Sequence, residues 1–117
     1  MSWATIPWNF GIKAGAISGG LGVLLGAFGA HALQSYTNDP KMLATWDTAS
    51  KYQLLHAGVL LLSSYHKSRI PVYCFIGGTL LFSGSLYLLV LTNQKKLGAI
   101  TPFGGLLLTA GWFSLLL

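Results

Sequence analysis

Three long stretches without a formal charge constrain this chain more than any other feature of its sequence. They cover residues 14–38, 70–94 and 97–117, which are 25, 25 and 21 residues long. A helix that crosses a membrane needs about 20 predominantly apolar residues. Only 8% of the residues are charged, whereas a soluble domain carries about 25%. The sequence therefore predicts an integral membrane protein.

A fourth uncharged stretch, residues 52–66, has 15 residues. As a helix it would measure only about 22 Å, against a hydrocarbon core of about 30 Å. It can still cross if the helix begins earlier and Lys51 extends its amine to the interface. We therefore expect an all-α membrane protein, with residues 1–117 forming one domain of four transmembrane helices in a compact glycine-rich bundle. The expected helices cover about residues 10–33, 40–65, 72–92 and 97–117.

The start of the last helix has two interpretations. It begins either at Leu97, with a kink at Pro102, or at Thr101, which would then cap the helix with Pro102 following it. The second interpretation leaves residues 97–100 at the membrane interface. Before the first helix, Trp3 and Trp8 are expected to anchor the chain at that interface.

Glycines recur along the first expected helix in steps of four, three, four and three residues. This repeat of 3.5 places them on one face of the helix. In lipid, small residues on one face allow a neighbouring backbone to come close. A phosphate-binding loop at "GGLGVLLG" is disfavoured, because no Lys-Ser/Thr pair follows and the stretch lies within an apolar span. The glycines expected to pack against other helices are Gly15, Gly19, Gly22, Gly26, Gly29, Gly77, Gly84, Gly104 and Gly111.

The second expected helix has a clear start and two distinct faces. Asp39 followed by Pro40 is typical of a helix N-cap and first helical position. Asp47 and Lys51 are four residues apart and are expected to form an ion pair on one face. The opposite face, which we expect to point into the bundle, carries Trp46, Ala49, Gln53 and His56.

Five polar residues are expected to meet near one membrane face: His31, Gln53, His56, Tyr87 and Thr101. Four roles are open to this cluster: hydrogen bonds that set helix register, a pocket for a lipid headgroup, quinone or other small molecule, a proton-linked transport path, or a bis-histidine haem. The transport path is disfavoured because no Asp or Glu lies within a span. The haem is disfavoured because many proteins without haem share this arrangement. His66, in a basic turn, is expected to be solvated or interfacial.

The sequence lacks the residues that several classes of function require. No nucleophile, base and acid are arranged for catalysis, and no zinc or dinucleotide motif is present. We expect no enzyme activity, no metal and no cofactor, although a lipid can be bound. The net charge of +5 comes from residues that flank apolar spans, as membrane anchors do, so no nucleic acid partner is expected. The single cysteine, Cys74, excludes a disulfide framework.

Four motifs occur in order: "LGAFGAHAL", "W..A..YQLLHA", "LFSGSLY" and "LGAITPFGGLLLTAGW". Together they resemble the small four-helix membrane family called domain of unknown function 423, whose eukaryotic branch is transmembrane protein 256. The resemblance covers about residues 14–113 and implies an integral membrane protein without known catalytic residues. The ending "FSLLL" soon after "GW" is similar to the eukaryotic branch. It favours a mitochondrial inner membrane, with a bacterial inner membrane as the alternative.

The expected function follows from how little of the chain lies outside the membrane. Such a protein must act through lipids or through other membrane helices. We expect a non-enzymatic accessory or assembly subunit of a larger inner-membrane complex of the respiratory-chain type, with membrane lipids and other membrane subunits as partners. The alternative is a stand-alone binder or transporter of a lipid, quinone or other small molecule through the polar cluster.

Overall fold

The computed structural model describes residues 9–117, so the anchor expected at Trp3 and Trp8 lies outside the described residues. The described chain is helical, and short turns or 3-10 segments join its helices. Its elements are α1 (Phe10–His31), η2 (Leu33–Ser35), α2 (Pro40–Ser63), α3 (Ile70–Thr92), η3 (Lys95–Ala99) and α4 (Thr101–Ser114).

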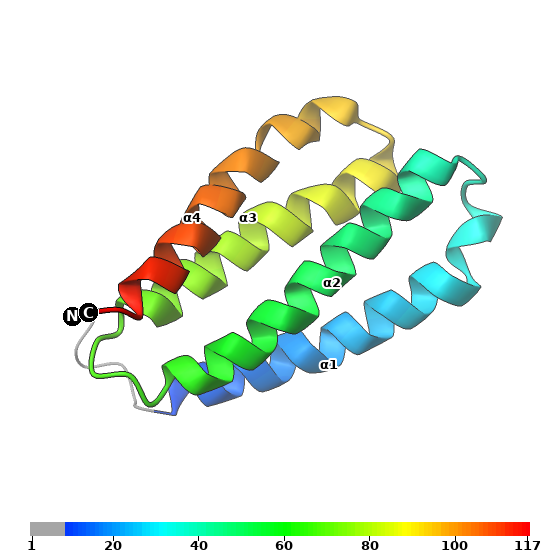
Figure 1. Ribbon diagram of the computed structural model, residues 1–117. Helices are drawn as coiled ribbons and strands as arrows, with labels where there is room; N and C mark the ends of the chain where they lie inside the picture. The colour runs from blue at the N-terminus through cyan, green and yellow to red at the C-terminus, as the bar shows by residue number, and fades with distance from the viewer. Residues whose placement is uncertain (1–8) are drawn as a thin grey trace.

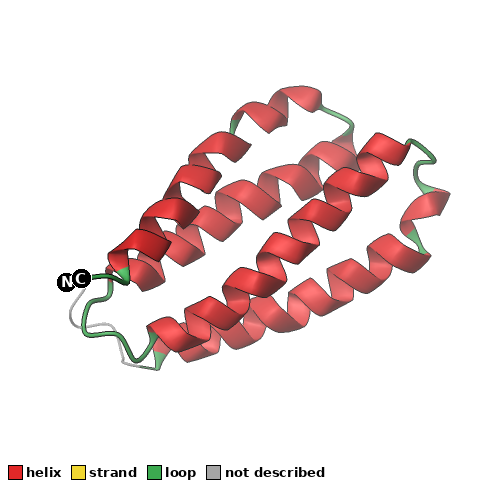
Figure 2. Ribbon diagram, viewed as in Figure 1, coloured by secondary structure: helices red, strands yellow, loops and turns green. Residues whose placement is uncertain are grey.

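Successive helices run antiparallel and lie side by side (Figures 1 and 2). The main contacts join α1 to α2, α2 to α3, and α3 to α4. Consequently α2 and α3 form the middle of the molecule, whereas α1 and α4 lie at its edges. The molecule measures 45 × 26 × 25 Å. The start of α1 and the end of α4 lie at the same end of the bundle.

Local sequence explains where several helices begin and end. The Asp39 carboxylate accepts a hydrogen bond from the Lys41 amide at 2.9 Å, and Pro40 occupies the first turn of α2, which confirms the predicted cap. At the other end of the bundle, Pro71 lies in the first turn of α3. Asn93 then ends α3 in the left-handed conformation that favours helix termination.

Three segments are long and apolar enough to cross a membrane: α1, α3, and residues Lys95–Ser114. The segment before Thr101 is a 3-10 helix and α4 begins at Thr101, so the predicted start at Leu97 is wrong and the start at Thr101 is confirmed. The predicted cap is wrong, because the residue in the N-cap position is Ile100 and Thr101 is the first helical residue. The helix α2 does not have a window apolar enough to be counted among the spans. Its 24 residues include charged side chains near one end and polar side chains in the middle.

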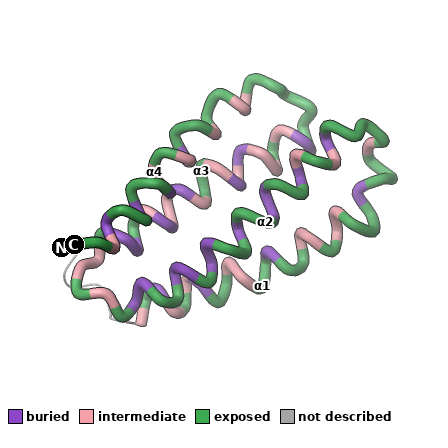
Figure 3. The backbone as a smooth tube through the Cα atoms, viewed as in Figure 1, coloured by how far each residue is buried: buried purple, intermediate pink, exposed green. Residues whose placement is uncertain are grey.

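Buried residues concentrate on α2, on α3, and on the positions of α4 that contact α3 (Figure 3). The four residues predicted to line the inner face of α2 are all buried: Trp46, Ala49, Gln53 and His56. On its outer face, the Lys51 amine lies 2.8 Å from a carboxylate oxygen of Asp47, and both side chains are exposed. The uncharged polar residues in the middle of α2, Gln53 and His56, therefore point into the protein, whereas its charged residues are exposed.

The glycines of α1 line its contact with α2. A Cβ added at Gly15 would lie 2.8 Å from the Ala57 carbonyl oxygen, and one at Gly22 would lie 2.9 Å from Leu54 Cδ2. At Gly29 it would overlap the Trp46 ring. The nearest atoms to Gly19 and Gly26 are at ordinary contact distances of 3.6 and 3.8 Å, and they also belong to α2.

Glycine also allows α3 and α4 to come close, but only some of the predicted positions take part. A Cβ at Gly104 would overlap the Phe82 backbone, and one at Gly111 would lie 2.8 Å from the Phe75 ring. The prediction for Gly84 is wrong, because no atom lies within 4 Å of its added Cβ. Gly77 makes an ordinary contact at 3.5 Å with Leu107, whereas its neighbour Gly78 makes the close one, at 2.7 Å from Leu108 Cδ2.

Candidate functional site

Gln53 connects three helices at the centre of the protein. It is buried on the inner face of α2. Its amide nitrogen donates to the Ser18 carbonyl oxygen of α1 at 2.8 Å. Its amide oxygen accepts a hydrogen bond from the Tyr87 hydroxyl of α3 at 2.7 Å. Each group of the Gln53 amide thus has a partner on a different helix, which sets the relative positions of α1, α2 and α3.

His56 belongs to a separate centre on the side of α2 that faces α4. The Trp112 indole nitrogen lies 3.0 Å from Nε2 of His56, and an indole N–H can only donate. Nε2 therefore carries no proton, and Nδ1 donates to the Tyr52 carbonyl oxygen at 2.7 Å. The ring is neutral, buried, and packed against Phe75 and Tyr52. Both nitrogens are occupied, so His56 has no free position for a metal or a proton path.

His31 does not join the cluster, and that prediction is wrong. It is the exposed last residue of α1, and its ring makes no hydrogen bond within residues 9–117. The reason is helical phase. His31 follows Gly29 by two residues, or about 200° around the helix, and Gly29 faces α2. The glycine face continues instead to Leu33, which is completely buried.

Thr101 also lies apart from Gln53 and His56, in contrast to the prediction. Its hydroxyl is 2.6 Å from the Ser85 hydroxyl of α3, and Ser85 also lies 3.0 Å from the Phe82 carbonyl oxygen. A carbonyl can only accept, so Ser85 donates to Phe82 and Thr101 donates to Ser85. The expected single cluster is therefore divided into a Gln53–Tyr87 centre, a His56–Trp112 centre and a Ser85–Thr101 pair.

His66 has a defined position in the turn between α2 and α3. The Ser68 amide donates to its Nδ1 at 3.1 Å, so Nε2 is the protonated nitrogen, 3.3 Å from the Leu115 carbonyl oxygen. The ring is half-buried, which is less exposed than predicted. Through these contacts His66 connects the turn to the end of α4.

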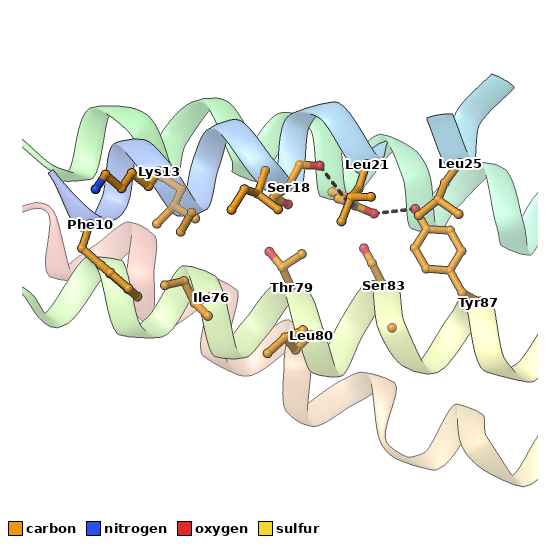
Figure 4. Close-up of a pocket in the computed structure, with 15 residues that line it drawn as sticks. Phe10, Lys13, Ser18, Leu21, Leu25, Ile76, Thr79, Leu80, Ser83 and Tyr87 are labelled. Atoms are coloured by element: carbon orange, nitrogen blue, oxygen red, sulfur yellow. Dashed lines mark hydrogen bonds between the residues drawn. The ribbon is translucent and has the colours of Figure 1, made fainter. Parts of the chain in front are cut away.

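A groove lies between α1 and α3, with α2 forming its floor (Figure 4). Its volume is about 540 Å³. Figure 4 shows Lys13 beside Phe10 at one end of the groove and Tyr87 beside Leu25 at the other. The groove is lined by Phe10, Lys13, Ala14, Ile17, Ser18, Leu21, Leu25, Gln53, Leu60, Ile76, Thr79, Leu80, Ser83, Gly84 and Tyr87. It exists because α4 packs against α3 and does not bridge α1 and α3.

Two of the predicted cluster residues, Gln53 and Tyr87, line this groove. Four polar residues outside the predicted cluster also line it: Lys13, Ser18, Thr79 and Ser83. Ser18 lies three residues after Gly15 and four before Gly22, so its position beside the glycine face was a usable signal. No sequence pattern marks Thr79 or Lys13 as a groove residue, because whether they line the groove depends on the distance between α1 and α3.

No group of three or more metal-ligating side chains occurs among residues 9–117. The polar centres of the described bundle are made instead of amide, hydroxyl, indole and imidazole groups that bond one another. Their geometry suits helix positioning, and the groove beside them suits an apolar ligand.

The family model described as "Protein of unknown function (DUF423)" matches residues 25–105 of this chain. The chain belongs to the DUF423 family. The match covers the end of α1, all of α2 and α3, and the first turn of α4, and it confirms the family inferred from the four motifs. It therefore includes Gln53, Tyr87 and His56, and excludes the Lys13 end of the groove.

Curated relatives of this DUF423 protein are named as membrane proteins. A UPF0382 membrane protein of Staphylococcus aureus is 39% identical over 112 residues, covering 91% of each chain. A UPF0382 membrane protein of Schizosaccharomyces pombe is 38% identical over 118 residues, covering 93% of this chain and 97% of the relative. No solved structure matches. The chain is thus similar to membrane proteins of both a bacterium and a yeast.

Proposed function

We propose that this DUF423 protein is a non-enzymatic subunit that acts inside the bilayer by packing against a larger membrane complex. The observation that carries the proposal is the distribution of exposed apolar side chains. Leu24 on α1 and Leu106 on α4 are each 68% exposed, on the two edge helices of the bundle. Edge helices with apolar outer faces can contact lipid or another protein's helices.

The proposal includes α2 as a fourth transmembrane helix. Its 24 residues would extend about 36 Å, which exceeds the hydrocarbon core of about 30 Å. It lies between α1 and α3, so it shares their depth in the bilayer. Its polar residues Gln53 and His56 are buried, and the exposed positions nearby include Leu55 and Leu62. This arrangement supports a span that its composition alone does not indicate.

A glycine-rich packing mode supports the same four-helix assembly. Gly15, Gly22 and Gly29 face α2, and Gly78, Gly104 and Gly111 lie in the α3–α4 contact. Dispersion forces between close backbones are a main source of helix association in lipid. No metal or cofactor is required for this function.

A mitochondrial inner membrane and a complex of the respiratory-chain type remain part of the proposal. Among the relatives, the yeast protein is compatible with a mitochondrial location. The staphylococcal relatives favour the bacterial membrane as the alternative. A function shared by both groups would have to operate in either membrane.

The native size of the protein tests the subunit role. Membranes are extracted with a mild detergent and separated on a native gel, and mass spectrometry identifies what migrates with the 12.5 kDa chain. A photo-crosslinking residue is placed at Leu24 or Leu106, with the buried position Leu108 as the control. We expect one partner to be crosslinked from an edge helix, and to migrate with the chain in a much larger complex. Migration alone or as a small homo-oligomer would overturn the subunit role.

The α1–α3 groove favours a second candidate function, a stand-alone binder of a membrane-dissolved molecule. Its volume of about 540 Å³ falls within the range of about 300–1,000 Å³ typical of ligand pockets. The two histidines are no longer central to this candidate, because His31 is exposed and both nitrogens of His56 have partners. Copurification of a stoichiometric small molecule with the isolated chain would support this second candidate.

A further inference from the structure

We propose that the α1–α3 groove holds one hydrocarbon chain of an anionic phospholipid, with the lipid phosphate beside Lys13. The inference names a ligand class for the groove of the second candidate and rests on that groove being occupied. It does not depend on the subunit role. The argument has three parts: the size of the groove, the charge at its end, and the hydroxyl groups along its wall.

The groove is long and mostly apolar. From Phe10 to Leu25 it follows 16 residues of α1, a rise of about 22 Å. Its volume is about 540 Å³, and most of the side chains along it are apolar. A single hydrocarbon chain can follow the groove over this length with its methylene groups against the apolar wall.

The charge at one end of the groove favours an anion. Lys13 lines the groove at the end of the bundle where α1 begins, and its amine has no partner within residues 9–117. Lys67 and Arg69 lie in the turn at the same end. Both acidic residues of the chain, Asp39 and Asp47, are at the opposite end, where they cap α2 and pair with Lys51. No Asp or Glu side chain therefore lies at this end.

Two hydroxyl groups are placed where a lipid carries its ester groups. Ser18 follows Lys13 by five residues, or about 7.5 Å along the helix axis. Thr79 lies across the groove from Ser18 (Figure 4). Neither hydroxyl has a hydrogen-bond partner within the described range 9–117. A hydroxyl in lipid gains from any acceptor, and the ester carbonyls of a phospholipid supply acceptors at about this depth.

The deeper part of the groove presents mainly carbon. Leu21, Leu25 and Leu80 line it. The polar atoms of Gln53 and Tyr87 are bonded to each other, and the Ser83 hydroxyl donates to the Ala49 carbonyl oxygen. A lipid can thus place its phosphate at Lys13, its ester groups near Ser18 and Thr79, and its chain along the leucines.

Native mass spectrometry of the full chain tests this proposal. The protein is placed in nanodiscs of phosphatidylcholine and phosphatidylglycerol in equal amounts, released in the gas phase, and the retained lipids are counted. We expect one retained lipid, with a preference for phosphatidylglycerol. Lys13→Gln should lower that preference about fivefold, since one lysine near an anionic lipid contributes about 1 kcal/mol. The matched control is Lys67→Gln, which removes a charge at the same end but outside the groove, and it should leave the preference nearly unchanged.

A second variant tests the position of the lipid chain. Thr79→Phe places a ring in the groove and should abolish retention of either lipid. Ser18→Leu replaces it as the test if Thr79→Phe does not give a helical, monodisperse protein. Equal losses from Lys13→Gln and Lys67→Gln, or full retention in the filled groove, would overturn the proposal. Loss in the filled groove with no preference for phosphatidylglycerol would overturn the anionic ligand and leave a groove binder. Absence of any retained lipid would overturn both the anionic phospholipid proposal and the second candidate function as a binder. It would not affect the subunit role.

Discussion

The α1–α2 and α3–α4 contacts both depend on glycine, but they distribute it differently. In the first contact the glycines lie on α1, and α2 supplies side chains such as Leu54 and Trp46. In the second, each helix contributes glycine: Leu108 of α4 fits at Gly78, and the Phe75 ring of α3 fits at Gly111. We call α1–α2 the smooth contact, because the glycine face of one helix packs against protruding side chains of the other. We call α3–α4 the interlocked contact, because each helix places a side chain at a glycine of the other.

This difference explains where the polar bonds are found. A smooth helix face can slide along its neighbour, so another interaction must set the register. In α1–α2, the Gln53 amide and the Trp46 indole donate to carbonyl oxygens of α1, at Ser18 and Leu25, both at 2.8 Å. The interlocked α3–α4 contact has its register set by shape and carries one hydroxyl pair, Ser85–Thr101. We infer that α1–α2 depends more on polar bonds and α3–α4 more on steric fit.

The largest effect is expected from Gly104→Ala in the interlocked contact. The added methyl group would overlap the Phe82 backbone, which cannot move without displacing α3. We expect the free energy of unfolding to fall by about 3 kcal/mol, the upper part of the usual range for overpacking. Reversible unfolding of the purified protein in mixed micelles measures this change.

The matched control for that variant is Gly84→Ala. Gly84 is also a helical glycine of this helix pair, but its added methyl group meets nothing within 4 Å. Its effect should be neutral or slightly stabilising, because alanine favours the helix more than glycine does. Similar losses in the two variants would mean that glycine acts here through something other than close contact.

The comparison of the two contacts also explains how far the sequence could predict them. Five glycines in regular steps define the inner face of α1 without knowledge of its neighbour, and all five face α2. Two glycines seven residues apart are a weaker signal. The prediction that such pairs pack against other helices is right for Gly104 and Gly111. It is wrong for Gly84, which is open, and on α3 the close approach is made by Gly78.

Only part of the candidate site could be predicted from the sequence, for similar reasons. The inner face of α2 follows from its helical period, so Gln53 and His56 were correctly placed inside the protein. Membrane depth alone does not specify direction around a helix axis, and for this reason His31 was wrongly assigned to the cluster. The groove could not be predicted, since it results from the packing of α4 against α3 rather than between α1 and α3.

An intermediate effect is expected from Gln53→Met in the smooth contact. Methionine keeps the length of the side chain but removes the bonds to the Ser18 carbonyl and the Tyr87 hydroxyl. Hydrogen bonds between membrane helices average about 0.6 kcal/mol, so the loss should be about 1.2 kcal/mol. Gln34→Met is the control, because Gln34 in η2 is exposed and its side chain bonds only the Ala30 carbonyl oxygen at the end of α1, at 3.5 Å. Equal stability of both variants would contradict the role of Gln53 in setting register.

The smallest effect is expected from Ser85→Ala in the interlocked contact. This change removes the acceptor for the Thr101 hydroxyl, and the shape of the contact stays the same. We expect a loss of about 0.6 kcal/mol or less, half of that for Gln53→Met. A double-mutant cycle with Thr101→Val isolates the pair, and Thr109→Val serves as the control because Thr109 bonds only within α4. A loss larger than that of Gln53→Met would reverse the comparison, since polar bonding would then stabilise α3–α4 more than α1–α2.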